Sequence, residues 1–262
     1  MIKKETYLTC PNSNIFEGIT SISAILNKFE QNVNRSTRTV VRVLVDEKKA
    51  HSKAREVSYL QKMAKKHGFS VCFVNSEQID ALTTGTTHGG IIAECAPKEI
   101  PLLINHMDEI RPDGVYVMLD GIEDPYNFGY SVRSIYASGA DGIILSPRNW
   151  MEVAGIVSKS SAGASELMDM YIADPADAIR LFREHGYKIV CSGIRNSVSM
   201  YDADLKKPLF LIVGGEKRGI SAKIESEADS VVRIEYGREF RGSLSAASAA
   251  TIMVYEIYRQ NR

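Results

Sequence analysis

The chain has 262 residues, of which 44% are hydrophobic and 24% are charged, and its 32 basic residues balance 32 acidic ones. This composition excludes a disordered or collagen-like chain and allows one or two domains that each bury a core. No segment approaches the roughly 18 consecutive apolar residues of a membrane span, and the first residues lack the apolar run of a secretory signal. Four widely spaced cysteines with no CxxC pair predict a cytoplasmic protein without a disulfide framework or a zinc site.

The first hundred residues predict a small α/β domain. β-branched runs indicate strands, and Val57, Leu60 and Met63 recur at helical spacing before Gly68, which ends the helix. The expected elements are a strand at 40–45, a helix at 52–67, a strand at 69–74, a short helix at 76–80 and a strand at 89–94. Three prolines then punctuate residues 97–112, where a short helix fits at 101–110. We therefore predict two domains, 1–108 and 109–262.

From residue 115 on, strands and helices alternate with short connections. Asp174 and Pro175 provide a helix cap and a proline at the first helical position. The expected elements are strands at 115–119, 142–145, 187–191, 209–213 and 230–234, and helices at 128–138, 151–162, 175–186 and 243–260. This alternation is typical of an α/β fold with a mostly parallel sheet and helices on both faces. Ligands of such sheets bind at the carboxyl ends of the strands, so the loops there are the candidate sites.

The loop after the strand at 115–119 leads into a helix that carries Arg133. Asn127 is placed to cap this helix, and Gly129 permits close approach of a ligand or another backbone segment. Arg133 lies nearly two turns into the helix, from where its fixed cation can reach back toward a phosphate. A helix cap and a surface arginine explain the same pattern without any function.

A second candidate loop contains adjacent glycines between a strand and a helix. Gly214 and Gly215 expose backbone groups that can hold a small polar ligand, with Glu216 at the edge. The segment is neither a GxGxxG fingerprint nor a P-loop, which leaves nucleotide hydrolysis without support. A tight turn with a capping acid is an equally good explanation.

The third candidate is a helix start rich in small residues, at 241–250. The hydroxyls of Ser243 and Ser245 can cap this helix or hold a ligand, although close helix packing explains the small residues equally well. Other kinds of site lack a motif. The five histidines show no metal-ligand spacing, no serine lies in GxSxG, and no cysteine has the context of a nucleophile.

Taken in chain order, these three loops resemble the three sequence motifs of the SpoU/TrmH family of RNA methyltransferases in the SPOUT superfamily. The matching segments are Asn127-Phe128-Gly129 with Arg133, Val213–Gly219, and the strand ending at Ile234 followed by Ser243-Leu244-Ser245. Residues 159–164 are similar to the family's connecting segment. Residues 1–100, which include the segment 88–94, are similar to the substrate-binding domain that often precedes this catalytic domain.

The resemblance implies a catalytic domain folded as a deep trefoil knot, which binds S-adenosylmethionine and works as a homodimer with its sites near the interface. The residues implied to bind the cofactor are Gly193, Val213, Gly214, Gly215, Glu216, Gly219, Ile234, Ser243 and Leu244. The implied partners are rRNA or tRNA and a second copy of the chain, with neither a membrane nor a metal.

The implied reaction is transfer of the cofactor's methyl group to a ribose 2′-hydroxyl of structured RNA. The catalytic residues carried over from the motifs are Asn127, Arg133, Glu216, Ser243 and Ser245. Arg133 would hold the RNA phosphate and assist deprotonation, Asn127 would position the hydroxyl, and Glu216 would orient the active-site network.

The chain also departs from the family pattern. Ser245 and Gly215 both stand where the family usually has asparagine, and two extra residues lie between Gly237 and Ser243. These departures keep two alternatives open. The first is a non-catalytic RNA- or ribosome-binding module that retains the fold. The second is a methyltransferase that acts on a base nitrogen, because a fold does not determine the acceptor.

A basic segment at 28–66, with eleven Lys and Arg residues against four acidic ones, is the candidate RNA contact. Most such runs are only solvated faces. The residues predicted to bind RNA are Arg35, Arg38, Lys62, Lys65 and Lys66.

Overall fold

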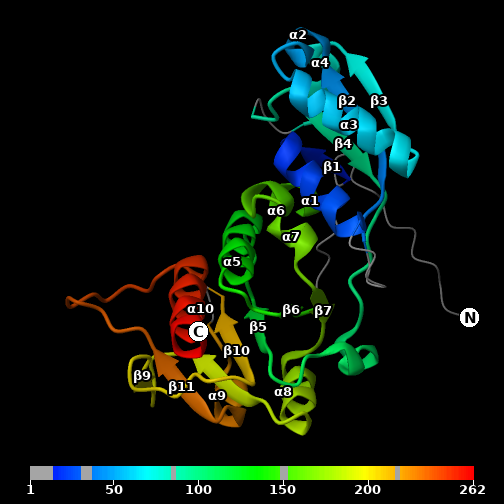
Figure 1. Cartoon of the computed structure of the whole chain (residues 1–262). Coiled ribbons are helices and arrows are strands. Elements are labelled where there is room, and N and C mark those ends of the chain that lie inside the picture. Colours follow the sequence, from blue (N-terminus) through cyan, green and yellow to red (C-terminus); the bar gives the residue numbers. More distant parts are fainter. Residues whose placement is uncertain (1–13, 31–36, 84–86, 148–152, 216–218) are drawn as a thin grey trace, which may run out of the picture. The chain divides into compact units, whose positions relative to one another are not determined.

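The structure, a computed structural model, describes residues 14–30, 37–83, 87–147, 153–215 and 219–262. Its backbone contacts divide the chain into two compact units (Figure 1). Unit 1 comprises Met1–Lys98 and Asn149–Glu166, and unit 2 comprises Glu99–Arg148 and Leu167–Arg262. The division falls earlier than the expected boundary after residue 108, and the segment 149–166 makes its contacts with unit 1. Local sequence patterns carry no signal for such a long-range return of the chain.

Unit 1 contains a mixed sheet with the strand order β1-β4-β2-β3. Only the β2–β3 pair is parallel among the described strands of this sheet. The strands are β1 (Ile15–Glu17), β2 (Val40–Asp46), β3 (Ser70–Val74) and β4 (Ile91–Cys95). The helices are α1 (Gly18–Glu30), α2 (Glu47–Ala50), α3 (Ala54–His67), α4 (Ser76–Asp80), α6 (Ala154–Ser160) and α7 (Ala164–Leu167).

The predicted elements of unit 1 are present, with boundaries set by local capping. Gly68 ends α3 in the left-handed conformation at φ +79°, and the Asn75 side chain caps α4 by accepting a hydrogen bond from the Gln78 N–H. Strand β1 and helix α1 were not predicted. They are held by burial, since Phe16 of β1 and Ile22 of α1 are inaccessible to solvent in the core of the unit.

Unit 2 contains a sheet of seven described strands, all parallel, in the order β7-β6-β5-β10-β8-β11-β9. The strands are β5 (Val115–Asp120), β6 (Gly142–Leu145), β7 (Met170–Ile172), β8 (Lys188–Ser192), β9 (Val198–Ser199), β10 (Leu209–Gly214) and β11 (Ser230–Arg233). The main helices are α5 (Pro125–Ala137), α8 (Pro175–Glu184), α9 (Ala222–Glu227) and α10 (Ala246–Asn261). The predicted α/β class with a parallel sheet is therefore confirmed. The knotted threading implied by the resemblance stays a prediction.

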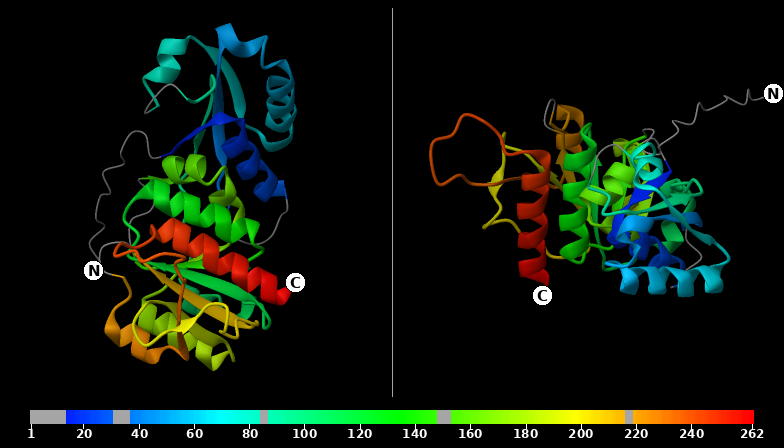
Figure 2. Two further views of the ribbon diagram at one scale, coloured as in Figure 1. Left: turned by 90° about the vertical axis from the view of Figure 1, so that its left-hand side faces the viewer. Right: turned by 90° about the horizontal axis from the view of Figure 1, so that it is seen from above.

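Helices cover both faces of this sheet (Figure 2). Helices α5 and α10 lie side by side on one face, and α8 and α9 lie on the other. Phe182 of α8 stacks on Phe210 of β10 with ring centroids 4.2 Å apart, and both rings are fully buried. Burial on two faces explains why the central strands are apolar at almost every position rather than at alternate ones.

Several predicted boundaries in unit 2 are wrong. Helix α5 begins at Pro125 rather than 128, because the Asp124 side chain accepts a hydrogen bond from the Asn127 N–H; Asp124, not Asn127, is the cap. Residues 101–110 form two short 3-10 turns, at Leu103–Asn105 and Met107–Glu109, instead of an α-helix.

Other differences are smaller. The last helix begins at Ala246 because Ser245 caps it, strands β7 and β9 were not predicted, and the described part of the helix expected at 151–162 is α6. Across the described ranges of both units, no helix combines the length and the apolarity that crossing a bilayer requires.

Candidate functional site

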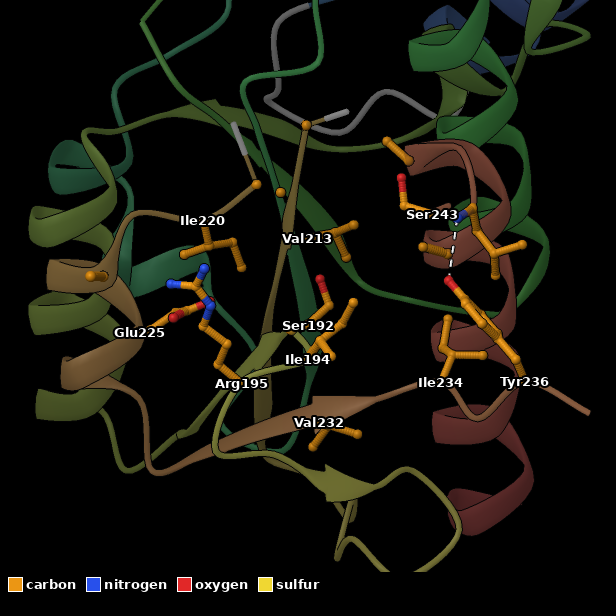
Figure 3. A pocket seen from close by; sticks show the side chains of 18 residues that line it. Ser192, Ile194, Arg195, Val213, Ile220, Glu225, Val232, Ile234, Tyr236 and Ser243 are labelled. Atoms are coloured by element: carbon orange, nitrogen blue, oxygen red, sulfur yellow. Dashed lines mark hydrogen bonds between the residues drawn. The ribbon is translucent and has the colours of Figure 1, made fainter. Parts of the chain in front are cut away.

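A pocket of about 430 Å³ lies at the carboxyl ends of the adjacent strands β10, β8 and β11 (Figure 3). Strand β10 lies between β5 and β8 in the sheet, and ligands of open α/β sheets bind outside the carboxyl ends of the strands. The wall of the pocket consists of residues from 192–195, 213–215, 219–225, 232–236 and 243–249.

The pocket brings together loops that are far apart in the sequence. Of the nine residues predicted to bind the cofactor, eight line it: Gly193, Val213, Gly214, Gly215, Gly219, Ile234, Ser243 and Leu244. The ninth, Glu216, lies outside the described residues, and its catalytic role stays a prediction. The second and third sequence motifs therefore meet at one site.

Glycines make this convergence sterically possible. A Cβ atom on Gly214 would lie 2.6 Å from the backbone carbonyl carbon of Gly219, and one on Gly215 would lie 2.0 Å from the carbonyl oxygen of Gly121. Gly219 adopts a positive φ of +61°, and its N–H donates to the Gly215 carbonyl at 3.0 Å. The loop after β10 thus folds tightly on itself and against the loop after β5. Gly215, where the family usually has asparagine, has no room for a side chain.

We expect Gly215→Ala to lower the free energy of unfolding by about 1–3 kcal/mol, because backbone atoms must move to admit the methyl group. Urea unfolding measures this change. Gly237→Ala is the matched control, since a Cβ atom there meets nothing within 4 Å. Equal stability of the two variants would show that the Gly121–Gly215 contact is not close in solution.

Two oppositely charged side chains of the pocket were not predicted. Figure 3 shows the Arg195 guanidinium and the Glu225 carboxylate pointing toward one another. Glu225 lies against Gly193, where a Cβ atom would come 3.1 Å from its Oε1 atom. The only available signal was position, since Arg195 follows the carboxyl end of β8. The pocket consequently offers both charges to a ligand.

Tyr236 is a further unpredicted residue of the pocket wall. Its hydroxyl accepts a hydrogen bond from the Leu244 N–H at 3.3 Å, which ties the chain after β11 to the start of α10. The Ser245 hydroxyl accepts from the Ser248 N–H at 3.1 Å and caps α10, and Ser245 does not line the pocket. Ser245 thus has a structural role as a helix cap, its catalytic role stays a prediction, and Ser243 lies in the wall.

Asn127 and Arg133 of the first motif lie on α5 and do not line the pocket. Asn127 is partly buried in the first turn, and Arg133 is exposed with no carboxylate in ion-pair range among the described residues. Helix α5 nevertheless lies beside α10, and the Thr251 and Ser134 hydroxyls are joined by a hydrogen bond of 2.7 Å. The first motif is thus adjacent to the helix that the third motif begins.

The residues predicted to bind RNA have different environments. Lys62 and Lys65 are exposed on α3, and Lys66 is exposed but paired with Glu30. Arg35 lies outside the described residues. The prediction for Arg38 is wrong as a surface contact: only 5% of the residue is exposed, and its guanidinium lies 3.1 Å from the Glu166 carboxylate and 4.5 Å from the centre of the Phe16 ring.

Thiol chemistry gains no support from Cys95 or Cys191. Burial raises the pKa of Cys191, at the end of β8 near the pocket, to about 12, and it raises the pKa of Cys95 to about 12. Both thiols are therefore neutral near pH 7 and are poor nucleophiles.

Comparison with known proteins matches the N-terminal and C-terminal parts of the chain to two families. Residues 114–255 match the SpoU rRNA Methylase family, and residues 17–101 match the family described as RNA 2′-O ribose methyltransferase substrate binding. The chain is 31% identical over 208 residues to the 23S rRNA (guanosine-2′-O-)-methyltransferase RlmB of Shewanella oneidensis, a match that covers 78% of this chain and 83% of that protein.

Solved structures share the fold. An AdoMet-bound rRNA methyltransferase from Sinorhizobium meliloti has a TM-score of 0.72 at 21% identity, covering 99% of this chain and 97% of that one. The SpoU methyltransferase AviRb from Streptomyces viridochromogenes, in complex with AdoMet, has a TM-score of 0.73 at 22% identity, covering 95% and 91%. With the second and third motifs around one pocket and both parts of the chain matched, this protein belongs to the SpoU rRNA methylase family and carries the family's N-terminal substrate-binding region.

Proposed function

We propose that the chain transfers a methyl group from S-adenosylmethionine to a ribose 2′-hydroxyl of structured rRNA or tRNA. The observation that carries this proposal is the convergence of eight predicted cofactor-binding residues around one pocket. Membership of the SpoU family supports it, as does the ribose methylation named for the relative from Shewanella oneidensis.

The pocket residues fit this cofactor. The volume of about 430 Å³ lies within the range of small-molecule sites, roughly 300–1,000 Å³. Gly193 and Gly214 line the pocket without side chains, and Val213, Ile220 and Ile234 offer apolar contacts to a flat ring. Arg195 and Glu225 would hold the opposite charges of an amino-acid group. A ligand with an aromatic base and a zwitterionic tail matches this mixture.

When bound, the cofactor supplies an electrophilic methyl group on a sulfonium centre. The protein's part is alignment, since holding reactants in line is worth about 7–11 kcal/mol at best. The side chain available to the RNA is Arg133, an exposed guanidinium with a planar set of N–H donors. It therefore acts as a fixed cation that holds an RNA phosphate and stabilises negative charge developing on the ribose oxygen. Asn127 would position that hydroxyl.

We further propose that two copies form the active protein through α5 and α10. Exposed aromatic rings on these adjacent helices support a protein contact there, because such rings are enriched at interfaces. They are Tyr126, Tyr130 and Tyr136 on α5, and Tyr255 and Tyr258 on α10. The dimer also accounts for the place of Arg133, which lies outside the wall of its own pocket and would serve the pocket of the second copy.

Three measurements test the proposed function. Isothermal titration calorimetry of the purified chain with S-adenosylmethionine should detect binding, and sedimentation should give twice the chain mass of 29.0 kDa. Ribose methylation, mapped in RNA from cells with and without the protein, should differ at discrete nucleotides. Absence of cofactor binding favours the non-catalytic RNA-binding module instead. A methyl group found on a base nitrogen would replace the ribose acceptor.

For RNA binding we expect Lys62→Ala and Lys65→Ala each to reduce the salt dependence of affinity, by up to about 0.7–0.9 in the logarithmic slope, since each lysine is free to meet a phosphate. Lys66→Ala should have a smaller effect because Glu30 already pairs with that ammonium group. Filter binding of rRNA between about 50 and 200 mM salt measures the slopes. Unchanged slopes in the Lys62 and Lys65 variants would show that this face of α3 does not contact RNA.

A further inference from the structure

An extended arm, Glu235–Gly242, connects β11 to α10 without any helix or strand of its own. It reaches outward from the sheet beyond the N-terminal end of α10, as seen in orange-red in Figures 1 and 2. The arm begins in the wall of the pocket, which Tyr236 lines. The chain returns to the wall at Ser243, directly after the arm. Anything bound in the pocket therefore has the arm as its neighbour.

Two aromatic rings are held in a defined geometry on this arm. Tyr236 and Phe240 pack edge to face with centroids 5.7 Å apart and ring planes at 61°. The Phe240 ring lies against Gly242, where an added Cβ would come 2.5 Å from its Cζ atom. The Tyr236 hydroxyl is anchored by the Leu244 N–H. Although these contacts orient the pair, 57% of Phe240 stays exposed to solvent.

The same arm presents two cations. Arg238 and Arg241 are both exposed, and no carboxylate within the described ranges lies at ion-pair distance from either. Of the two acidic residues on the arm, Glu235 is paired with Arg233 at 3.1 Å, and Glu239 is exposed. An oriented, exposed ring can stack on a planar group of a ligand, and the guanidinium groups on either side of it in the sequence can contact anionic groups of the same ligand.

We propose that the arm is a nucleobase platform: Phe240 stacks on a base of the RNA strand whose ribose enters the pocket, and Arg238 and Arg241 contact phosphates beside it. This inference rests on the proposed function. RNA is recognised largely at unstacked bases, which pair readily with aromatic faces and arginine planes. A protein partner fits less well, because one ring between two arginines offers little apolar area to bury.

The test uses ribosomal RNA from cells lacking the protein as methyl acceptor. We expect Phe240→Ala to raise the KM for RNA on the order of 5- to 100-fold, the range that loss of one base–aromatic stack produces. Phe240→Trp should keep the wild-type KM. Phe240→Leu, which retains apolar volume without an aromatic face, should behave like alanine. The affinity for S-adenosylmethionine should stay unchanged in all three variants, and Gly242→Ala, which displaces the ring, should raise the KM in the same direction.

Tyr201→Ala is the matched control, because it removes a ring that is 61% exposed in the same unit but does not line the pocket. The platform is overturned by a wild-type KM in Phe240→Ala, by rescue with leucine, or by a changed sedimentation mass, which would make the arm a contact between two copies. If the wild-type protein neither binds the cofactor nor transfers methyl groups, the proposed function has failed. Filter binding of the same RNA then tests whether Phe240 stacks on a base. Equal RNA affinity of Phe240→Ala and wild type refutes the platform.

Discussion

We expect Arg133→Ala to reduce methyl transfer to RNA by about 10²- to 10³-fold, the usual contribution of one group that stabilises charge developing in the transition state, while S-adenosylmethionine binds with wild-type affinity. The cofactor affinity should survive because Arg133 does not line the pocket. Stability should survive as well, since the side chain is exposed and alanine is a strong helix former. Arg133→Lys keeps the charge but loses the planar fork that grips a phosphate, so its rate should be intermediate.

Single-turnover transfer of a radiolabelled methyl group to rRNA, together with calorimetry of cofactor binding, separates these effects. Arg180→Ala is a suitable control, because it removes another exposed helical arginine of the same unit, one already paired with Glu184. A wild-type rate in Arg133→Ala would remove this residue from the mechanism. Weakened cofactor binding would instead place the guanidinium in the pocket. In a mixed dimer, activity restored by a second copy that has an intact Arg133 but a disabled pocket would show that the residue acts across the interface.

The second large effect concerns stability. We expect Arg38→Met to lower the free energy of unfolding by about 3–5 kcal/mol, because it leaves the Glu166 carboxylate buried without its partner. The two side chains are only 3% and 5% exposed, and Arg38 also donates to the Ala96 carbonyl at 3.2 Å. The double variant Arg38→Met, Glu166→Leu should recover much of this loss, since it removes both buried charges.

Urea unfolding of the full chain measures these differences. Arg42→Met is the matched control, because the Arg42–Glu94 pair has 48% and 39% of its side chains exposed, and such surface pairs contribute about 0–1 kcal/mol. Similar losses in Arg38→Met and Arg42→Met would mean that the Arg38–Glu166 pair is hydrated in solution. Because Glu166 lies on α7 and Arg38 precedes β2, this pair also fastens the returning segment 149–166 to the rest of unit 1.

Much of the site followed from short segments of sequence, for a physical reason. A parallel sheet brings the carboxyl ends of its strands to one edge, which made the loops after the strands candidate sites, and the family resemblance implied that their glycine and serine residues share one cofactor. Gly193, Gly214 and Ser243 line one pocket. Their partners in the wall could not be predicted in this way. Arg195, Glu225 and Tyr236 belong to the pocket only because of how the loops pack, and no sequence spacing indicates that they line it.

The sequence by itself determined the α/β class, the order of most strands and helices, and the caps at Asp174 and Gly68, because hydrophobic periodicity and backbone conformation are local properties. Only the tertiary structure decided that α1 and the segment 149–166 complete unit 1, that Gly215 touches Gly121, and that the basic residue Arg38 is buried. Each of these depends on contacts between residues distant along the chain. Burial then reverses what the residue type suggests: the Arg38 guanidinium is paired with Glu166 inside unit 1 and is not accessible to an RNA phosphate.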